Sequence, residues 1–315
     1  RDVLDTMDYS LTRLKAPIHK LTHLFSRNTR TGSKKNISAH YDIGNDLFKL
    51  FLDETMMYSS AYYENANMTL GEAAVAKLEL VCNKLDLGPE DHLLEIGTGW
   101  GGLAVHAARN YGCKVTTTTI SEEQYRLALK KVMNEGLEDR ITVLKQDYRD
   151  LSGQYDKLVS IEMIEAIGHQ YMDTYFEKCE SLLKPDGMML IQAITIKEQY
   201  YKSALKDVDF IKKYIFPGGF LPSVSAMSSA IGKYTDMKIF HLQDIGPHYA
   251  RTLKDWRERF FSRLDEIRDL GYSDEFIRLW EYYFCYCEGG FMERDIGTVQ
   301  MVLTRPGNRR EPVML

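Results

Sequence analysis

A glycine-rich turn follows a short apolar segment and has the composition of a nucleotide-binding loop. Residues 94–102 read LEIGTGWGG, with Glu95 two positions before the first of three alternating glycines, Gly97, Gly99 and Gly101. Glycines let the backbone turn tightly and approach a ligand beside the N-terminus of the next helix. An acidic residue before the first glycine favours the amino-acid part of S-adenosylmethionine (SAM) over a pyrophosphate. The turn alone is weak evidence, so the neighbouring segments have to decide between these ligands.

Polar side chains lie at the ends of the next two predicted strands, 113–120 and 141–144, where a bound nucleoside would lie. Asp147 and Tyr148 follow the second of these strands, and we expect the carboxylate and the ring to bind and stack an adenine. The alternative is a loop aspartate beside a surface tyrosine. The strand predicted at 113–120 lacks the acidic residue that usually binds a ribose. Thr119 and Gln124 are the polar side chains available in its place.

Helices and strands alternate from about residue 69, which predicts an α/β fold with a doubly wound parallel sheet. Thr69 and Ser121 each begin a sequence typical of a capping box. The expected strands are 92–96, 113–120, 141–144, 158–161, 188–194 and 298–304, and the expected helices are 69–86, 101–111, 121–136, 172–183, 251–269 and 274–288. We predict a turn at 184–187. An aromatic insertion at 196–235, marked by glycine and proline, lines an apolar pocket or only caps the sheet.

The composition is that of a globular protein, with 44% hydrophobic and 27% charged residues among 315. These values exclude disordered, collagen-like and disulfide-rich classes. The five cysteines are scattered, which is typical of a reducing compartment. Cys285 and Cys287 have no second Cys or His pair at zinc spacing, so we expect no metal site. No apolar run reaches the roughly 18 to 20 residues of a membrane span, and we therefore expect a cytoplasmic protein.

A basic amphipathic stretch lies near the start of the sequence. Seven lysines and arginines and no acidic residue occur between Arg13 and Lys35, although the whole chain has a net charge of −5. Apolar residues recur there at helical spacing. Such an arm suits an anionic membrane surface or a nucleic acid. A helix packed on the protein body is the alternative.

Six motifs in order make the chain resemble the cyclopropane-fatty-acyl-phospholipid synthases. They are HYDIGNDLF at 40–48, MYSSAY at 57–62, EIGTGWGG at 95–102, TISEEQ at 119–124, QDYRD at 146–150 and YIFPGG at 214–219. The resemblance covers about residues 36 to 305 and is far more specific than one glycine turn. It implies a class I SAM-dependent methyltransferase domain at 39–305, a basic arm at 1–38 and a tail at 306–315.

The resemblance implies transfer of a carbon from SAM to the cis double bond of a phospholipid acyl chain, which closes a cyclopropane ring. The residues expected to contact SAM are Tyr58, Ser59, Glu95, Gly97, Gly99, Trp100, Gly101, Thr119, Gln124, Asp147 and Tyr148. The reaction site of the family holds a bicarbonate ion as general base. Its ligands here would be Ser60, Glu165, Gln192, Ile194 and Tyr249.

Two of these ligand positions depart from the family pattern. Ser60 stands in place of a cysteine and Gln192 in place of a histidine. Both can hydrogen-bond an anion, but Gln192 cannot gain a proton. The position of one base decides which proton leaves the acyl chain, so a methyl-branched or methylene product stays open. Glu165 is the first candidate for orienting the base, Glu162 is its local competitor, and capping of the next helix is the alternative role of Glu165.

The partner implied by the resemblance is an anionic bilayer surface with unsaturated acyl chains, at the inner face of the membrane. We expect no nucleic-acid partner and leave a homodimer open. A methyltransferase for a small water-soluble molecule is one rival, against which the apolar insertion and the basic arm count. A non-enzymatic lipid-binding module is another, and the intact glycine turn with Asp147 argues against it.

Overall fold

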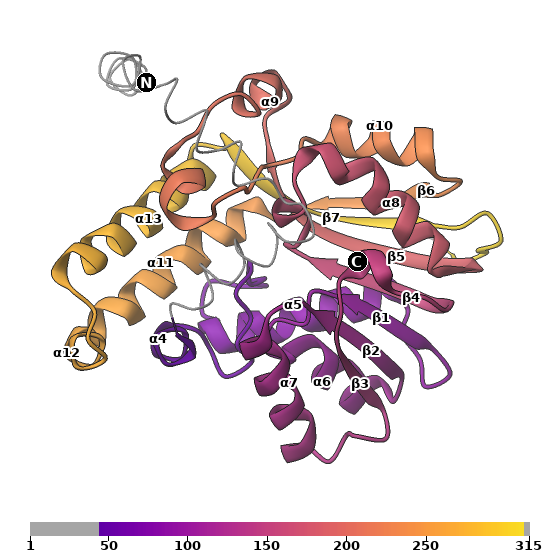
Figure 1. The fold of residues 1–315 in the computed structure, drawn as a ribbon, viewed down its shortest axis with the longest axis horizontal. Helices are drawn as coiled ribbons and strands as arrows, with labels where there is room; N and C mark the ends of the chain where they lie inside the picture. Colours follow the sequence, from indigo (N-terminus) through magenta and orange to yellow (C-terminus); the bar gives the residue numbers. More distant parts are fainter. Residues whose placement is uncertain (1–43, 312–315) are drawn as a thin grey trace.

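The computed structural model describes residues 44–311, which form a seven-stranded sheet with helices on both faces (Figure 1). The strand order is β3-β2-β1-β4-β5-β7-β6. The strands are β1 (His92–Ile96), β2 (Lys114–Thr119), β3 (Ile141–Lys145), β4 (Tyr155–Ile161), β5 (Leu183–Ile196), β6 (Lys238–Asp244) and β7 (Ile296–Thr304).

The sheet is mixed, which corrects the expectation of a parallel sheet. β1 to β5 pair in parallel, whereas β7 pairs antiparallel with both β5 and β6. The sequence-based prediction also missed β6, an edge strand whose residues are half-buried or exposed. Such a strand lacks the continuous apolar run of a buried parallel strand. The turn predicted at 184–187 is part of β5, whose pairing with β4 changes register at Tyr155 and Lys157.

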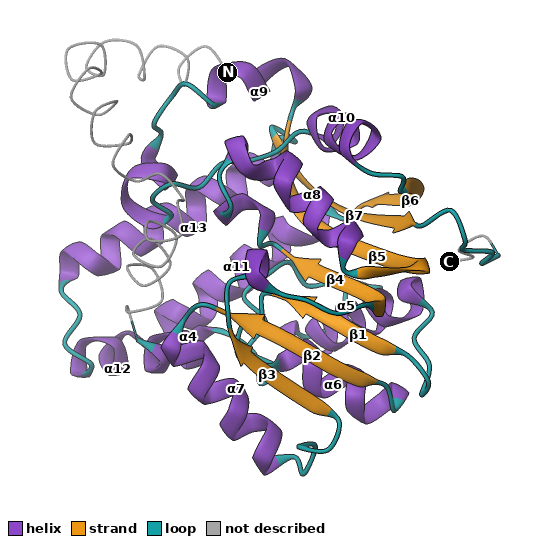
Figure 2. Cartoon of the chain, turned by 45° about the vertical axis from the view of Figure 1, so that its right-hand side comes forward, coloured by secondary structure: helices purple, strands orange, loops and turns teal. Residues whose placement is uncertain are grey.

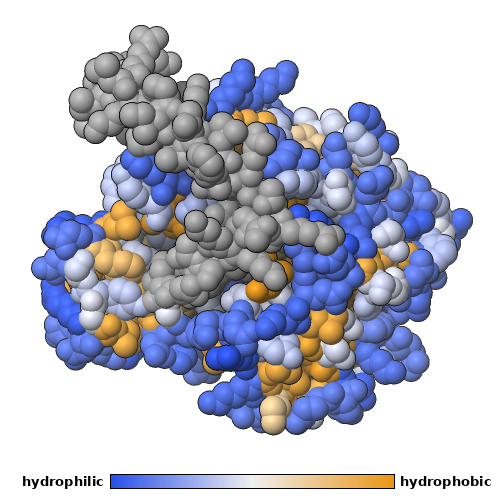
Figure 3. Space-filling model, in the orientation of Figure 1, coloured by the Kyte–Doolittle hydropathy of each residue, from blue (hydrophilic) through white to orange (hydrophobic). Residues whose placement is uncertain are grey.

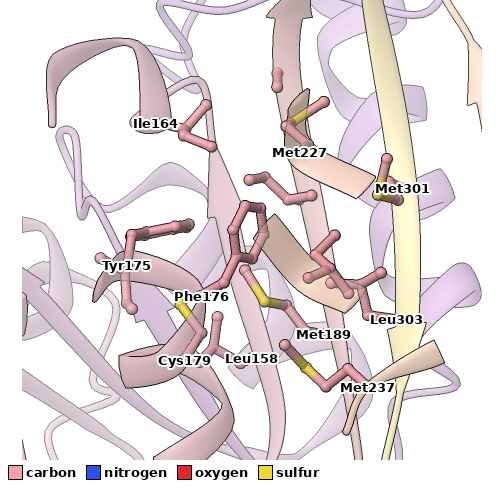
Figure 4. Packing of buried hydrophobic residues seen from close by; sticks show 14 of the residues in the cluster. Leu158, Ile164, Tyr175, Phe176, Cys179, Met189, Met227, Met237, Met301 and Leu303 are labelled. Carbon is pink, nitrogen blue, oxygen red and sulfur yellow. The ribbon is translucent and has the colours of Figure 1, made fainter. Parts of the chain in front are cut away.

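Helices cover both faces of the sheet and bury its apolar side chains (Figure 2). They are α5 (Leu70–Leu85), α6 (Gly102–Tyr111) and α7 (Glu122–Asn134) on one face, and α8 (Met172–Ser181) and α10 (Val224–Tyr234) on the other. On the second face, Tyr175 and Phe176 of α8 and Met227 of α10 pack against Met189 and Leu303 (Figure 4). This close packing holds the strand ends in fixed positions.

A third layer lies at the carboxyl ends of the parallel strands (Figure 2). It consists of α4 (Asn45–Phe51), α11 (Gly246–Ser262), α12 (Leu264–Asp269) and α13 (Asp274–Met292). We call its buried rings the aromatic cap, and they are Phe48, Phe51, Trp256, Phe260, Trp280 and Phe284. The rings of Phe260 and Trp280 are stacked with their centroids 6.0 Å apart.

The insertion at 196–235 forms α9 (Glu198–Ala204), a π-helical turn (Ile211–Ile215) and α10. Its side chains pack in two places: Ile215 packs against the aromatic cap, and Phe220 packs in the core beneath α8 and α10. The insertion therefore helps to cover the sheet. Within residues 44–311, no helix combines the length and apolarity needed to cross a bilayer.

Candidate functional site

A cavity of about 160 Å³ opens where β1, β2 and β4 end. Every residue that the sequence predicts to contact SAM lines this cavity, except Gly101. The predicted residues that line it are Tyr58, Ser59, Glu95, Gly97, Gly99, Trp100, Thr119, Gln124, Asp147 and Tyr148. Residues distant in the sequence thus meet at one place because parallel strands end at the same edge of the sheet.

The glycine turn closes β1 against β2 and leaves room for a ligand. Gly97 has a φ of +104°, and the N–H groups of Gly97 and Thr98 both donate to the carbonyl oxygen of Thr118. Apart from Gly99 itself and its two neighbours in sequence, no residue has an atom within 4 Å of the place where a Cβ on Gly99 would be. Gly101 has a different task, because it is the N-cap of α6 and a Cβ there would lie 3.4 Å from Ala128.

Two acidic residues of the cavity wall are held by neighbouring side chains. The Glu95 carboxylate accepts a hydrogen bond of 2.6 Å from the Thr117 hydroxyl, and burial raises the pKa of Glu95 to about 8. The two oxygens of Asp147 accept from the Arg149 guanidinium at 2.9 and 2.6 Å. The sequence analysis missed Arg149, which orients the Asp147 carboxylate at the end of β3.

The polar pair at the end of β2 is also fixed before any ligand binds. The hydroxyl of Thr119 donates to Oε1 of Gln124 at 2.8 Å. Because the Gln124 side chain is bound to Thr119, the capping box predicted at Ser121 is only half formed. The backbone N–H of Gln124 donates to the Ser121 hydroxyl, but the Gln124 side chain does not accept from the Ser121 backbone N–H. At Thr69 the reciprocal capping box is complete.

Glu162 lines the cavity, and three donors hold its carboxylate. Oε1 accepts from the Ser60 backbone N–H at 3.0 Å and from Gln192 Nε2 at 2.8 Å. Oε2 accepts from the Tyr249 hydroxyl at 2.7 Å. Burial raises the pKa of Glu162, and the three hydrogen bonds oppose that shift by stabilising the carboxylate.

Glu165 lies three residues further on and faces a different direction. Its Oε1 accepts from the backbone N–H of Ile194 at 2.6 Å, and its buried Oε2 has no hydrogen-bond partner among the described residues. Burial, reinforced by the neighbouring Glu162, raises the pKa of Glu165 to about 8. Glu165 does not line the cavity and does not cap a helix, since it lies in the 3₁₀ turn Ile164–Ala166.

The five predicted ligands of an anion therefore separate into two groups, each already bound to a carboxylate of the chain. Ser60, Gln192 and Tyr249 donate to Glu162, and Ile194 donates to Glu165. The Ser60 hydroxyl donates to the carbonyl of Ala61 and so does not point to an anion site. These donors do not fit a bicarbonate ion, because each of them is already bound to Glu162 or Glu165.

Buried polar side chains extend from Glu162 through the sheet. Oε1 of Gln192 accepts from Gln300 Nε2 at 2.9 Å, and Oε1 of Gln300 accepts from Lys84 Nζ at 2.7 Å. Lys77, two turns before Lys84 on the same face of α5, donates to the Ser59 hydroxyl at 3.0 Å. Burial lowers the pKa of Lys77 to about 8, although the charge of Glu162 acts in the opposite direction. The sequence analysis singled out neither lysine.

The donor set suits SAM. The cavity is lined by the glycine turn, the Asp147 carboxylate and the Tyr148 ring. The Tyr148 ring packs edge-on against Tyr175, with the two ring centroids 5.5 Å apart. These groups provide backbone, carboxylate and aromatic contacts for an amino acid, a ribose and an adenine. Among the residues that the structure describes, no group of three or more His, Cys, Asp or Glu side chains is placed to hold a metal.

Comparisons with known proteins identify the family of the chain. The model of a family described as mycolic acid cyclopropane synthetase matches residues 28–301. The chain is 40% identical over 287 residues to the tuberculostearic acid methyltransferase UfaA1 of Mycobacterium tuberculosis, covering 89% of this chain and 67% of that protein. It is 43% identical over 266 residues to the cyclopropane-fatty-acyl-phospholipid synthase of Escherichia coli, covering 84% and 66%.

The solved structures include similar folds. The mycolic acid cyclopropane synthase CmaA1, in complex with SAH and CTAB, has a TM-score of 0.80 and 32% identity, with 86% of this chain and 98% of that chain covered. The class I methyltransferase fold predicted from the sequence is thereby confirmed. The chain spans about two thirds of the length of the two curated relatives named above.

Proposed function

The chain belongs to the mycolic acid cyclopropane synthetase family, and from that membership we propose that it transfers a carbon from SAM to the cis double bond of an unsaturated phospholipid acyl chain. The product that we propose is a cyclopropane ring. One observation carries this proposal: the glycine turn after β1 and the carboxylate of Glu162 line the same cavity.

The chemistry needs both of these groups. An alkene is a weak nucleophile, and SAM supplies the activated methyl group that it attacks. Positive charge then develops on the acyl chain, so the protein must keep water away and provide a single base. Aromatic faces stabilise such a charge. Tyr249 lies in this region, stacked on Phe291 with ring centroids 4.5 Å apart.

A methyl-branched or methylene fatty acid is the second candidate product. Ser60 and Gln192 favour it, because they replace the cysteine and histidine that the resemblance leads us to expect. A relative that is 40% identical carries the name tuberculostearic acid methyltransferase. The two products share the first step and differ in whether the cation loses a methyl proton directly, with ring closure, or loses a proton after a hydride shift along the chain, so one assay separates them.

The first test incubates the chain with SAM and anionic vesicles whose phospholipids carry cis-monounsaturated chains. We expect the fatty methyl esters to gain one CH2 by mass spectrometry and to show upfield ring protons by proton NMR. Vinyl or branched-methyl signals with the same gain in mass would support the second candidate. No gain in mass, while calorimetry shows that SAM binds, would contradict a phospholipid substrate.

We also propose that the protein docks on the bilayer that holds its substrate. Aromatic rings are exposed on α13 and on the π-helical turn Ile211–Ile215: Tyr214, Tyr282 and Tyr286 are 54%, 52% and 47% exposed, and Lys213 Nζ lies 4.7 Å from the centroid of the Tyr214 ring. Apolar residues also reach the surface on the side formed by α11 to α13 (Figure 3). Tyrosine and lysine together are typical of membrane interfaces. The basic stretch of the sequence analysis lies outside the described residues.

Charge reversal in the basic stretch tests this docking. We expect the double variant Lys34→Glu, Lys35→Glu to bind anionic vesicles at least about 10-fold more weakly at low salt, because each cation near such a surface contributes about 1 kcal/mol. Flotation with labelled vesicles measures the binding. Lys114→Glu is the matched control, since Lys114 is exposed at the start of β2, at the opposite end of that strand from the cavity. Equal binding by the double variant and the control would contradict the proposal.

A further inference from the structure

The carboxylate of Glu162 occupies the centre of a donor set built for an anion. A backbone N–H, a side-chain amide and a phenol converge on its two oxygens at 3.0, 2.8 and 2.7 Å. All three groups donate, and two of the residues that supply them, Ser60 and Gln192, are buried. Three donors around one carboxylate stabilise its ionised form.

The direction of the donors is set from outside the cavity. Lys84 Nζ donates to the Gln300 oxygen, which leaves the Gln300 amide nitrogen to donate to the Gln192 oxygen. The Gln192 amide nitrogen can then face only Glu162. Lys84 thus fixes the orientation of the Gln300 amide, and Gln300 fixes that of the Gln192 amide. The chain of hydrogen bonds therefore presents an N–H to the Glu162 carboxylate and never a carbonyl oxygen.

The backbone of Glu162 has a strained conformation. Its φ is +48°, the left-handed region that favours glycine, and such a conformation costs about 1–2 kcal/mol for other residues. A glycine would remove that cost but would also remove the carboxylate. Strain of this kind persists where the surrounding structure holds a residue for its chemistry.

We propose that the side-chain carboxylate of Glu162 is the proton acceptor of the reaction, in place of an exogenous bicarbonate ion. This inference rests on the proposed function. Glu162 lines the cavity, whereas Glu165 does not, and Lys77 supplies a nearby positive charge. Glu165 is a positioning residue, because its carboxylate holds the backbone N–H of Ile194 next to Gln192 on β5.

The step balances with the groups present. The π electrons of the alkene form a bond to the methyl carbon, the sulfur–methyl bond breaks, and its electron pair stays on sulfur. The acyl chain is left with one positive charge. A C–H bond of the new methyl then gives its electron pair to the ring-closing C–C bond, and its proton passes to a Glu162 oxygen. The cation and the carboxylate are both neutralised, and the acid later loses its proton to solvent.

The test compares Glu162→Gln and Glu162→Gly with the unaltered chain and with Glu165→Gln, in buffer freed of carbon dioxide. We expect Glu162→Gln to lower kcat about 100- to 10,000-fold, the usual range for a lost general base, with the Kd for SAM changed less than about threefold. Glu162→Gly suits the positive φ and opens the anion position. Formate or bicarbonate should restore part of its activity and should raise its Tm.

The unaltered chain should show neither effect, because its own carboxylate fills the position. Glu165→Gln should lose less activity than Glu162→Gln and should not respond to formate. Three results would overturn the inference: full activity of Glu162→Gln, loss of wild-type activity without bicarbonate that returns on adding it, or the same formate-induced rise in Tm for the wild type and Glu162→Gly. The Tm comparison needs no turnover, so it tests Glu162 even if the proposed lipid substrate is wrong.

Discussion

Tyr249→Phe is expected to lower kcat at pH 7 by about 10- to 100-fold and to restore most of it at higher pH. The Tyr249 hydroxyl donates to Oε2 of Glu162 at 2.7 Å. Losing a hydrogen bond to a charged group costs about 1.5–3 kcal/mol, which corresponds to about one to two pKa units. The lost donor had favoured the carboxylate, so the pKa of Glu162 rises and a smaller fraction is ionised at pH 7. Activity that needs the carboxylate therefore moves to higher pH.

The pH profile of kcat distinguishes this effect from a packing defect. Its acid limb should shift upward in Tyr249→Phe, while Lys77 and Glu165, the other titratable groups that interact with Glu162, are unchanged. Tyr63→Phe is the matched control, because the buried Tyr63 also donates to a carboxylate, that of Asp255 on α11, and Asp255, unlike Glu162, does not line the cavity. A loss of kcat that is the same at every pH would contradict the prediction.

The sequence predicted the part of the fold that depends on local patterns. Buried parallel strands have continuous apolar runs, and the glycine turn after β1 needs specific residue types, so both could be found from the chain alone. The edge strand β6 could not, because a half-exposed strand has no such run. The direction of β7 also has no local signal, since antiparallel pairing with β5 depends on the path of the helices α11 to α13 before it.

The candidate site was predictable in composition but not in arrangement. The motifs indicated which residues gather at the strand ends, and the cavity contains them. They could not indicate that Glu162 and Glu165 face different donors, because that depends on the positive φ of Glu162 and the 3₁₀ turn that follows. Lys77 and Lys84 did leave a signal: they are seven residues apart, on the face of α5 that also carries Leu78 and Val81. Buried lysines at helical spacing indicate a polar network behind the site.

Trp280→Ala is expected to lower the free energy of unfolding by about 3–5 kcal/mol, the range for truncating a buried aromatic residue. Trp280 is 1% exposed and contacts Phe51 and Phe284 of the aromatic cap, with centroids 5.6 and 5.5 Å from its own. The neighbouring rings are held by several elements and cannot close around the missing indole. Urea unfolding measures the loss, and Glu281→Ala, at the next and exposed position of α13, should change stability by less than about 0.5 kcal/mol.

The aromatic cap also connects this stability to the cavity. Phe48 contacts Trp280 at 6.0 Å, and its ring lies 5.0 Å from Trp100 and 5.1 Å from Tyr58, both of which line the cavity. Loosening Phe48 should therefore weaken SAM binding in Trp280→Ala about 3- to 10-fold by calorimetry, since about 1 kcal/mol of ordering is lost. Trp280→Phe keeps an aromatic ring and should recover most of both losses. A large loss of stability with unchanged SAM affinity would instead mean that the cap supports the fold without positioning the cavity wall.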